Sequence, residues 1–113
     1  MIGLDPELQG TVGARWLAKH GTLADVPLTC NSLLSLAAAV VAGLGLSPLP
    51  CVFGDREPEL ERALPGVIGR HDLWLVVHPD VRSSARVRAI MDYLTELVLA
   101  ETPLLSGNLR AKR

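Results

Sequence analysis

Two pairs of side chains flank a short apolar run in the second half of the chain, and their types could bind a metal ion or carry protons. His71 and Asp72 precede the run, and His78 and Asp80 follow it. Their spacing fits no recognised set of metal ligands, and a strand of this length would hold the two pairs ~17–20 Å apart. We therefore expect no metal and no cofactor, and we interpret these residues as solvated strand ends.

A nucleophile, a base and an acid can also be assembled from Ser32, His71 and Asp72. However, the sequence contains no G-x-S-x-G turn, which would present a serine nucleophile between a strand and a helix. Residues 43–45, Gly-Leu-Gly, follow an apolar helical run instead of opening one, so they are typical of a helix end and not of a dinucleotide-binding loop. We do not expect an enzyme.

The charge distribution argues against nucleic acid as a direct partner. The 113 residues carry a formal net charge of -1, and the sequence pI is about 6.3. Arg86 and Arg88 open a predicted helix, where the helix dipole disfavours positive charge, so we expect them to be solvated or to meet acidic partners within the fold. The basic end, residues 108–113, is typical of a solvated terminus.

Strands and helices alternate along the chain, which predicts an α/β fold with parallel strands. Asp5 and Pro6 are typical of the start of a first helix, and Asn31 or Ser32 of the start of a second. The predicted elements are strand Ile2–Leu4, helix Pro6–His20, strand Val26–Cys30, helix Leu33–Ala42, strand Leu46–Leu49, strand Leu73–Val77 and helix Ser84–Glu101.

Apolar spacing predicts which helix faces are buried. Leu8, Val12 and Trp16 lie at i, i+4 and i+8 and predict the buried side of the first helix. The helix over residues 33–42 is apolar almost all round, so we expect other elements to cover it on every side. The last helix carries an apolar stripe at helical spacing, made of Val87, Ile90, Met91, Leu94, Leu97 and Val98.

No acidic or basic residue lies between Asp25 and Asp55, so a membrane span has to be weighed. Prolines and glycines divide this stretch, and its helix-forming run, residues 33–43, is shorter than the ~20 residues that cross a bilayer. A buried helix is the better interpretation. The chain opens with nothing that resembles a signal peptide, and Cys30 and Cys51 are expected to be buried reduced thiols. We expect a cytoplasmic protein with no membrane partner.

Several motifs, in order, resemble the effector-binding domain of LysR-type transcriptional regulators. They are IGLD at residues 2–5, RWLAKH at 15–20, NSLLSLAAAVVAGLGLSPLP at 31–50 and LWLVVHPDVRSSARVRAIMDYL at 73–94. The resemblance covers about residues 2–98. It identifies the chain as the C-terminal part of that domain.

The resemblance implies a fold like that of type-2 periplasmic binding proteins, in which two α/β subdomains clasp a small effector. On that plan residues 1–66 are part of the second subdomain, and 67–72 are the crossover linker. Residues 73–101 are the closing strand and helix of the first subdomain, and 102–113 form a flexible basic tail. The domain is expected to be incomplete, because the other strands of the first subdomain are absent from the sequence.

The resemblance also implies where an effector binds. In such folds the contacts come from the carboxyl ends of strands and the N-termini of the following helices. Carried over by position, these are Leu4, Asp5 and Pro6 after the first strand, and Asn31 and Ser32 after the second. Three of them also suit helix capping, and both roles are compatible because a cap faces the same crevice. A small organic acid or related metabolite is the expected effector, although Asp5 would repel an anion unless offset.

The implied function is to sense a small-molecule effector as part of a LysR-type regulator, without the winged helix that binds DNA and as a subunit of an oligomer. A stand-alone α/β module that dimerises with an intact regulator, or an inactive remnant, is the alternative. A solute-binding protein for transport is disfavoured by the missing export signal. An unpaired last strand and an uncovered last helix predict marginal stability or recruitment of a second copy.

Overall fold

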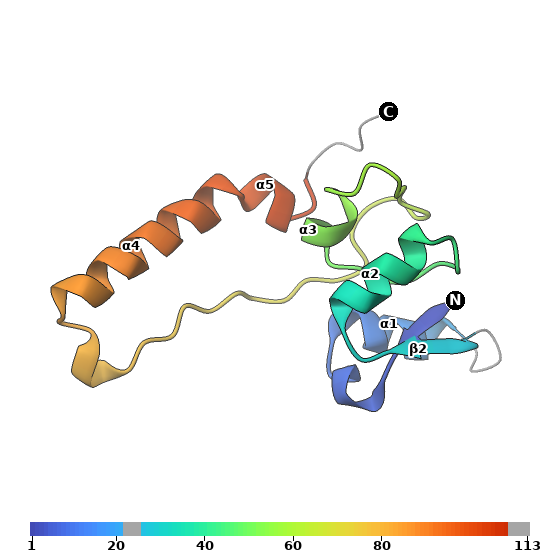
Figure 1. The fold of residues 1–113 in the computed structure, drawn as a ribbon, viewed down its shortest axis with the longest axis horizontal. Helices are drawn as coiled ribbons and strands as arrows, with labels where there is room; N and C mark the ends of the chain where they lie inside the picture. Colours follow the sequence, from blue (N-terminus) through green and yellow to red (C-terminus); the bar gives the residue numbers. More distant parts are fainter. Residues whose placement is uncertain (22–25, 109–113) are drawn as a thin grey trace.

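The N-terminal part of the chain is a small βαβ unit (Figure 1), and the computed structural model describes residues 1–21 and 26–108. Strands β1 (Ile2–Leu4) and β2 (Leu28–Cys30) pair in parallel, with Leu4 opposite Cys30. Helix α1 (Val12–His20) contacts β1, and helix α2 (Leu33–Val41) contacts both strands. The predicted parallel α/β pattern is confirmed for this part.

The core between these elements is small. Ile2, Leu4, Ala14 and Leu36 form its buried cluster, and half-buried apolar side chains pack around them. Helix α2 buries Leu36 but leaves Leu34 exposed, so the expectation that α2 is covered on every side is wrong. One apolar face of α2 therefore points to solvent.

The first predicted helix is divided into two. Residues Pro6–Leu8 form a 3-10 turn, η1, and α1 begins only after Thr11, whose hydroxyl oxygen accepts a hydrogen bond from the Ala14 N–H at 3.3 Å. Ala14 and Leu17 are the buried residues of α1, whereas Val12 and Trp16 are half-buried, so the predicted buried face is wrong for residues 12 and 16. Leu8 packs against the core as predicted. The face of α1 that carries Gly13 packs closely against Pro48, because a Cβ atom on Gly13 would lie 3.0 Å from that proline.

Residues 46–49 do not form the predicted strand, although they lie along the free edge of β1. The Ile2 N–H donates to the Leu46 carbonyl at 2.8 Å, as in a parallel ladder. The next ladder bond would come from the N–H of residue 48, which is a proline and has none. The Ser47 hydroxyl donates to the Ile2 carbonyl instead, at 2.9 Å.

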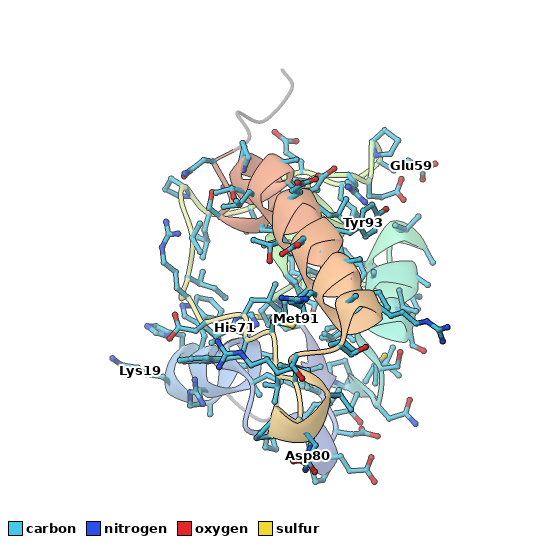
Figure 2. All side chains as sticks on the ribbon, turned by 90° about the vertical axis from the view of Figure 1, so that its left-hand side faces the viewer. Lys19, Glu59, His71, Asp80, Met91 and Tyr93 are labelled. Carbon is cyan, nitrogen blue, oxygen red and sulfur yellow. The ribbon has the colours of Figure 1, made fainter. Side chains whose placement is uncertain are left out.

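The predicted closing strand, Leu73–Val77, is also absent. These residues are extended but belong to no sheet, and Trp74 and Val76 are 79% and 85% exposed. Helix α4 (Ala85–Ala100) is confirmed, with Ser84 at its N-cap, yet none of its residues is buried. Figure 1 shows α4 standing away from the βαβ unit, joined to it by the extended segment and the 3-10 turn η3 (Pro79–Val81). Figure 2 shows the same molecule with α4, which carries Met91 and Tyr93, in front.

A junction of two short helices holds the far end of α4. Helix α3 (Cys51–Gly54) contacts α5 (Thr102–Leu105), and Leu104 of α5 is buried. The flexible tail expected from residue 102 onward is therefore wrong for residues 102–107. The basic end at residues 109–113 lies outside the described residues.

The described chain is extended for its length. Its radius of gyration is 16.8 Å, whereas a compact domain of this size has one of about 13 Å. Within residues 1–21 and 26–108, no helix combines the length and apolar character that a bilayer crossing requires. Cys30 and Cys51 are both free thiols, and both are half-buried instead of buried.

Candidate functional site

The loops that follow β1 and β2 lie at the same end of the sheet. Because the strands are parallel and Leu4 is opposite Cys30, residues 5–6 and 31–32 leave the sheet side by side. The Asp5 N–H donates to the Cys30 carbonyl at 3.0 Å, which continues the pairing one residue beyond the strands. The sequence-predicted effector residues are thus brought together by the fold.

Two of these residues offer little to a ligand. The Leu4 side chain is buried, and its carbonyl oxygen accepts a hydrogen bond from Gln9 Nε2 at 2.8 Å. Pro6 is exposed but has no N–H to donate. Gln9, in the turn between η1 and α1, was not predicted, and nothing in its sequence spacing indicates that it reaches back to the strand end.

The Ser32 hydroxyl group caps the N-terminus of α2. Its hydroxyl oxygen accepts hydrogen bonds from the N–H groups of Leu34 and Ser35 at 3.2 and 3.4 Å, which confirms the predicted cap of α2. These are the N–H groups that an anion at the helix N-terminus would need. The first turn of α2 is therefore largely satisfied by the protein itself.

Asp5 and Asn31 remain as polar side chains of the strand-end loops. Asp5 is half-buried and makes no capping hydrogen bond to η1, so its predicted role as a helix cap is wrong. Asn31 is exposed. The Asp5 carboxylate only accepts hydrogen bonds, whereas the Asn31 amide can accept and donate them, so this pair suits a hydroxyl or ammonium group better than a second carboxylate.

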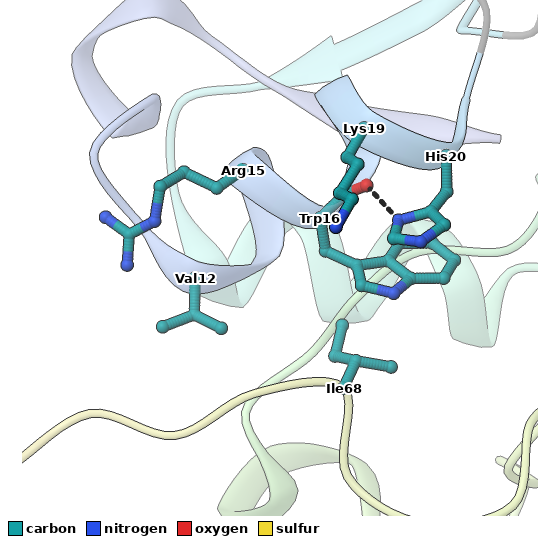
Figure 3. Close-up of a pocket in the computed structure, with 6 residues that line it drawn as sticks. All are labelled: Val12, Arg15, Trp16, Lys19, His20 and Ile68. Atoms are coloured by element: carbon teal, nitrogen blue, oxygen red, sulfur yellow. Dashed lines mark hydrogen bonds between the residues drawn. The ribbon is translucent and has the colours of Figure 1, made fainter.

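A separate cavity of about 270 Å³ lies on the outer face of α1 (Figure 3). Five residues of α1 line it, together with Ile68. Apart from Val12, the lining side chains of α1 are basic or aromatic: Arg15, Trp16, Lys19 and His20. This cavity was not predicted, because Val12 and Trp16 were interpreted as core residues.

The four residues considered for metal binding, at positions 71, 72, 78 and 80, are exposed on either side of the extended segment. The Asp80 N–H donates to His78 Nδ1 at 3.2 Å, which caps η3, and both side chains are exposed. Across residues 1–21 and 26–108, no group of three potential His, Cys, Asp or Glu ligands gathers. The Ser32 hydroxyl caps α2, and His71 and Asp72 are exposed.

The comparisons with known proteins give one match. The family described as LysR substrate binding domain matches residues 11–98. The matched range contains α1, β2, α2, α3 and most of α4. No curated protein and no solved structure matched the chain.

Proposed function

Because the chain belongs to the LysR substrate binding domain family, we propose that it is the C-terminal part of the effector-sensing domain of a LysR-type transcriptional regulator. On this proposal residues 1–66 supply one wall of a two-subdomain clasp like that of type-2 periplasmic binding proteins. Residues 67–72 cross to the first subdomain, and 73–101 supply its closing elements. The effector is a small metabolite that binds between the two walls.

One observation carries the proposal of an incomplete clasp. Residues 73–76 are exposed, as are Ile90, Leu97 and Val98 of the apolar stripe of α4, and no residue of α4 is buried. The main contact of α4 with another helix or strand is the one with α5. Exposed apolar strands and helix faces of this kind normally pack against a sheet. The elements that would cover them are the remaining strands of the first subdomain.

Asp5 and Asn31 carry the effector contact at this wall. The proposed role is to bind a donor group of the effector, such as a hydroxyl or ammonium group, through the Asp5 carboxylate. Asn31 can bind either a donor or an acceptor next to it. Leu4, Pro6 and Ser32 shape the loops instead, because Leu4 is buried, Pro6 has no donor and Ser32 caps α2.

The incompleteness is tested on the 113-residue chain alone. We expect a broad thermal transition, binding of a dye that reports exposed apolar surface, and a size that grows with concentration. Replacing Trp74 and Val76 by serine should lower dye binding and size, whereas Leu44→Ser, at an exposed leucine outside the segment, should change neither. A monodisperse monomer with a cooperative melt would overturn this part of the proposal.

The proposed effector contact at Asp5 and Asn31 is tested by calorimetric titration of the chain with small acids, hydroxy acids and amino acids. One wall provides too few contacts for tight binding, so weak heats or none are expected. Tight stoichiometric binding would contradict an incomplete clasp. If weak binding occurs at this wall, Asp5→Asn and Asn31→Ala should abolish it, with Glu7→Gln as a matched exposed acid outside the strand ends.

A second candidate function rests on the same exposed surface. Residues 73–100, hereafter called the arm, expose apolar side chains that can also pack against an intact regulator of the family and form a mixed dimer. Co-purification of the chain with a family regulator would favour this module. Loss of co-purification in the Trp74 and Val76 double serine variant would place the contact on the arm.

A further inference from the structure

Strand β2 has backbone groups that point away from the sheet and lack a partner. The Asp5 N–H donates to the Cys30 carbonyl, so residues 28 and 30 direct their backbone groups at β1 in the parallel register. Because this direction alternates along a strand, the N–H and C=O of Thr29 point outward. None of the loop and turn hydrogen bonds of the described residues ends on either group. Thr29 is exposed, and β2 therefore presents an open edge.

The other edge of the sheet is already occupied. The Ile2 N–H donates to the Leu46 carbonyl, and the Ile2 carbonyl accepts from the Ser47 hydroxyl. The sheet of the described residues has two strands, so its available edge is that of β2. An open edge of this kind is a template for pairing with a further strand.

The extended segment at residues 73–77 is a strand without a sheet. Within the described chain, no backbone N–H or C=O of residues 71–77 takes part in a hydrogen bond. The segment reads Leu-Trp-Leu-Val-Val, in which Trp and Val are residue types enriched in strands. It carries no charged side chain, so it lacks the usual device that keeps an exposed strand from pairing.

The segment does not pair with β2 of its own chain. Ile68, five residues before it, lies beside the outer face of α1. From there the segment leads away from the βαβ unit toward α4 (Figure 1). The far end of the arm is held by α5, which contacts α3 and buries Leu104. A second copy of the chain can bring its segment to the β2 edge free of this constraint.

We propose that two copies of this chain exchange the segments, so that residues 73–77 of each copy form a third strand beside β2 of the other. The outward N–H and C=O of Thr29 then pair with backbone groups of the incoming segment. Each copy supplies one edge and one strand, so the exchange is reciprocal and closes a two-fold dimer instead of an open fibre. Main-chain pairing of this kind is a recurrent mode of recognition between chains.

This inference rests on the same uncovered segment as the proposed function, but the two fail on different results. Association that survives removal of the pairing groups would reject strand exchange and leave the incomplete clasp standing. Tight effector binding by the chain would reject the incomplete clasp and leave strand exchange standing.

Two proline variants of the full chain remove the pairing groups one at a time. Thr29→Pro deletes an N–H that points away from β1, and Leu75→Pro deletes one in a segment that makes no backbone hydrogen bond. Neither costs the βαβ unit a hydrogen bond, so circular dichroism should show unchanged helix content. Thr29→Val and Leu75→Val are the matched controls, because valine keeps the N–H and favours strands.

Sedimentation and amide hydrogen exchange measure the outcome. The unmodified chain should form a dimer of twice its 12.1 kDa mass as its concentration rises. Each proline variant should dimerise about tenfold more weakly or not at all, since each removes a backbone hydrogen bond from both junctions. The valine controls should dimerise like the unmodified chain. The amides of residues 73–77 should be protected from exchange in the dimer and not in the proline variants.

Mixing the two proline variants tests the exchange itself. The Thr29→Pro chain keeps an intact segment, and the Leu75→Pro chain keeps an intact β2 edge, so one junction can form between them. An equimolar mixture should therefore associate at concentrations where neither variant associates alone. Two variants that had merely lost their fold would not rescue each other.

Three results would overturn the proposal. The first is a chain that stays monomeric at every concentration. The second is dimerisation that both proline variants leave intact, which would assign the contact to apolar side chains such as those of α4. The third is a mixture that associates no more than its components. If Thr29→Pro does not fold, the comparison of Leu75→Pro with Leu75→Val and the exchange of residues 73–77 decide.

Discussion

Arg62 and Asp55 form an ion pair with two hydrogen bonds, from Nε to Oδ1 at 3.0 Å and from Nη2 to Oδ2 at 2.6 Å. Nη2 also donates to the Gly107 carbonyl at 2.9 Å. Asp55 follows α3 and Gly107 follows α5, so one guanidinium joins the ends of two short helices. This contact fixes the C-terminal end of the α4 arm to the rest of the chain.

Replacing Arg62 by lysine should destabilise the protein by about 1–2 kcal/mol, because an ammonium group does not reproduce the paired hydrogen bonds of a guanidinium. The two side chains are only 28% and 12% exposed, so solvent screens the pair little. The matched control is Arg56→Lys, whose partner Glu101 lies at 3.0 Å in a pair that is 60% and 43% exposed. Urea unfolding should show almost no effect of that control. Equal losses in the two variants would contradict the contribution assigned to the Arg62 pair.

The alkaline side of the stability profile gives a second check. The hydrogen bond to Asp55 raises the pKa of Arg62 above its ordinary value. A group whose pKa is raised on folding contributes stability that is fully present below its unfolded pKa and is lost as pH rises through the folded value. For arginine that window lies above pH ~12, so the difference between wild type and Arg62→Gln should be the same at pH about 7 and about 9. A difference that shrinks between these two values would show that another group carries it.

Gly107 should tolerate no side chain. Its φ is +72°, and a Cβ atom would lie 2.7 Å from Cys51 Sγ and 2.8 Å from Val67. Gly107→Ala should therefore cost about 2–4 kcal/mol through backbone strain and overlap together. Gly66→Ala isolates the backbone term, since φ there is +81° with open space around it, and should cost about 1 kcal/mol. Gly10→Ala, with open space and no positive φ, should be nearly neutral. The ranking of the thermal midpoints tests this order.

Removing the cap of α2 should be measurable on its own. Ser32→Ala deletes the oxygen that accepts from Leu34 and Ser35, and should cost about 1 kcal/mol. Ser35→Ala, at an exposed serine inside the same helix, should be neutral or slightly stabilising because alanine favours helix. If both variants lose the same stability, the cap contributes nothing beyond the loss of a hydroxyl.

Limited digestion with trypsin should cleave the arm before the βαβ unit. Arg82, Arg86 and Arg88 are exposed in or beside the first turn of an uncovered helix, whereas Arg15 and Lys19 lie on a helix that packs against the sheet. Early cleavage is expected after the former set, as judged by mass spectrometry of the fragments. Early cleavage at Lys19 would mean that the βαβ unit opens before the arm does.

The parts of the fold that depend on local chemistry could be predicted from the sequence. Ser32 caps α2 as expected, and Gly43 and Gly45 end it with φ values of +76° and +149°. Helix α4 begins and ends within a residue of its predicted bounds. These features depend on capping, glycine conformations and helical spacing, and each of these is determined by residues that are close together in the sequence.

The features that failed depend on contacts between distant residues. Leu73–Val77 has the composition of a buried strand, but a strand needs a partner, and the two-stranded sheet of the described chain offers none nearby. The orientation of α1 was mispredicted because its start at Thr11 and the close approach of Pro48 to Gly13 decide which face is buried. The α1 cavity was missed for the same reason.

Pro48 limits the side of the sheet on which a further strand can pair. With the ladder along β1 stopped at that proline, backbone pairing on this side ends after a single bond, and the Ser47 hydroxyl occupies the next carbonyl. On the outer edge of β2, Pro27 lacks an N–H only before the strand begins, and Leu28 and Thr29 of the strand itself are exposed. A further strand, whether from the same protein or from a neighbouring molecule, would therefore pair beside β2 from Leu28 onward, and unwanted polymerisation through β-strands is restricted to that edge.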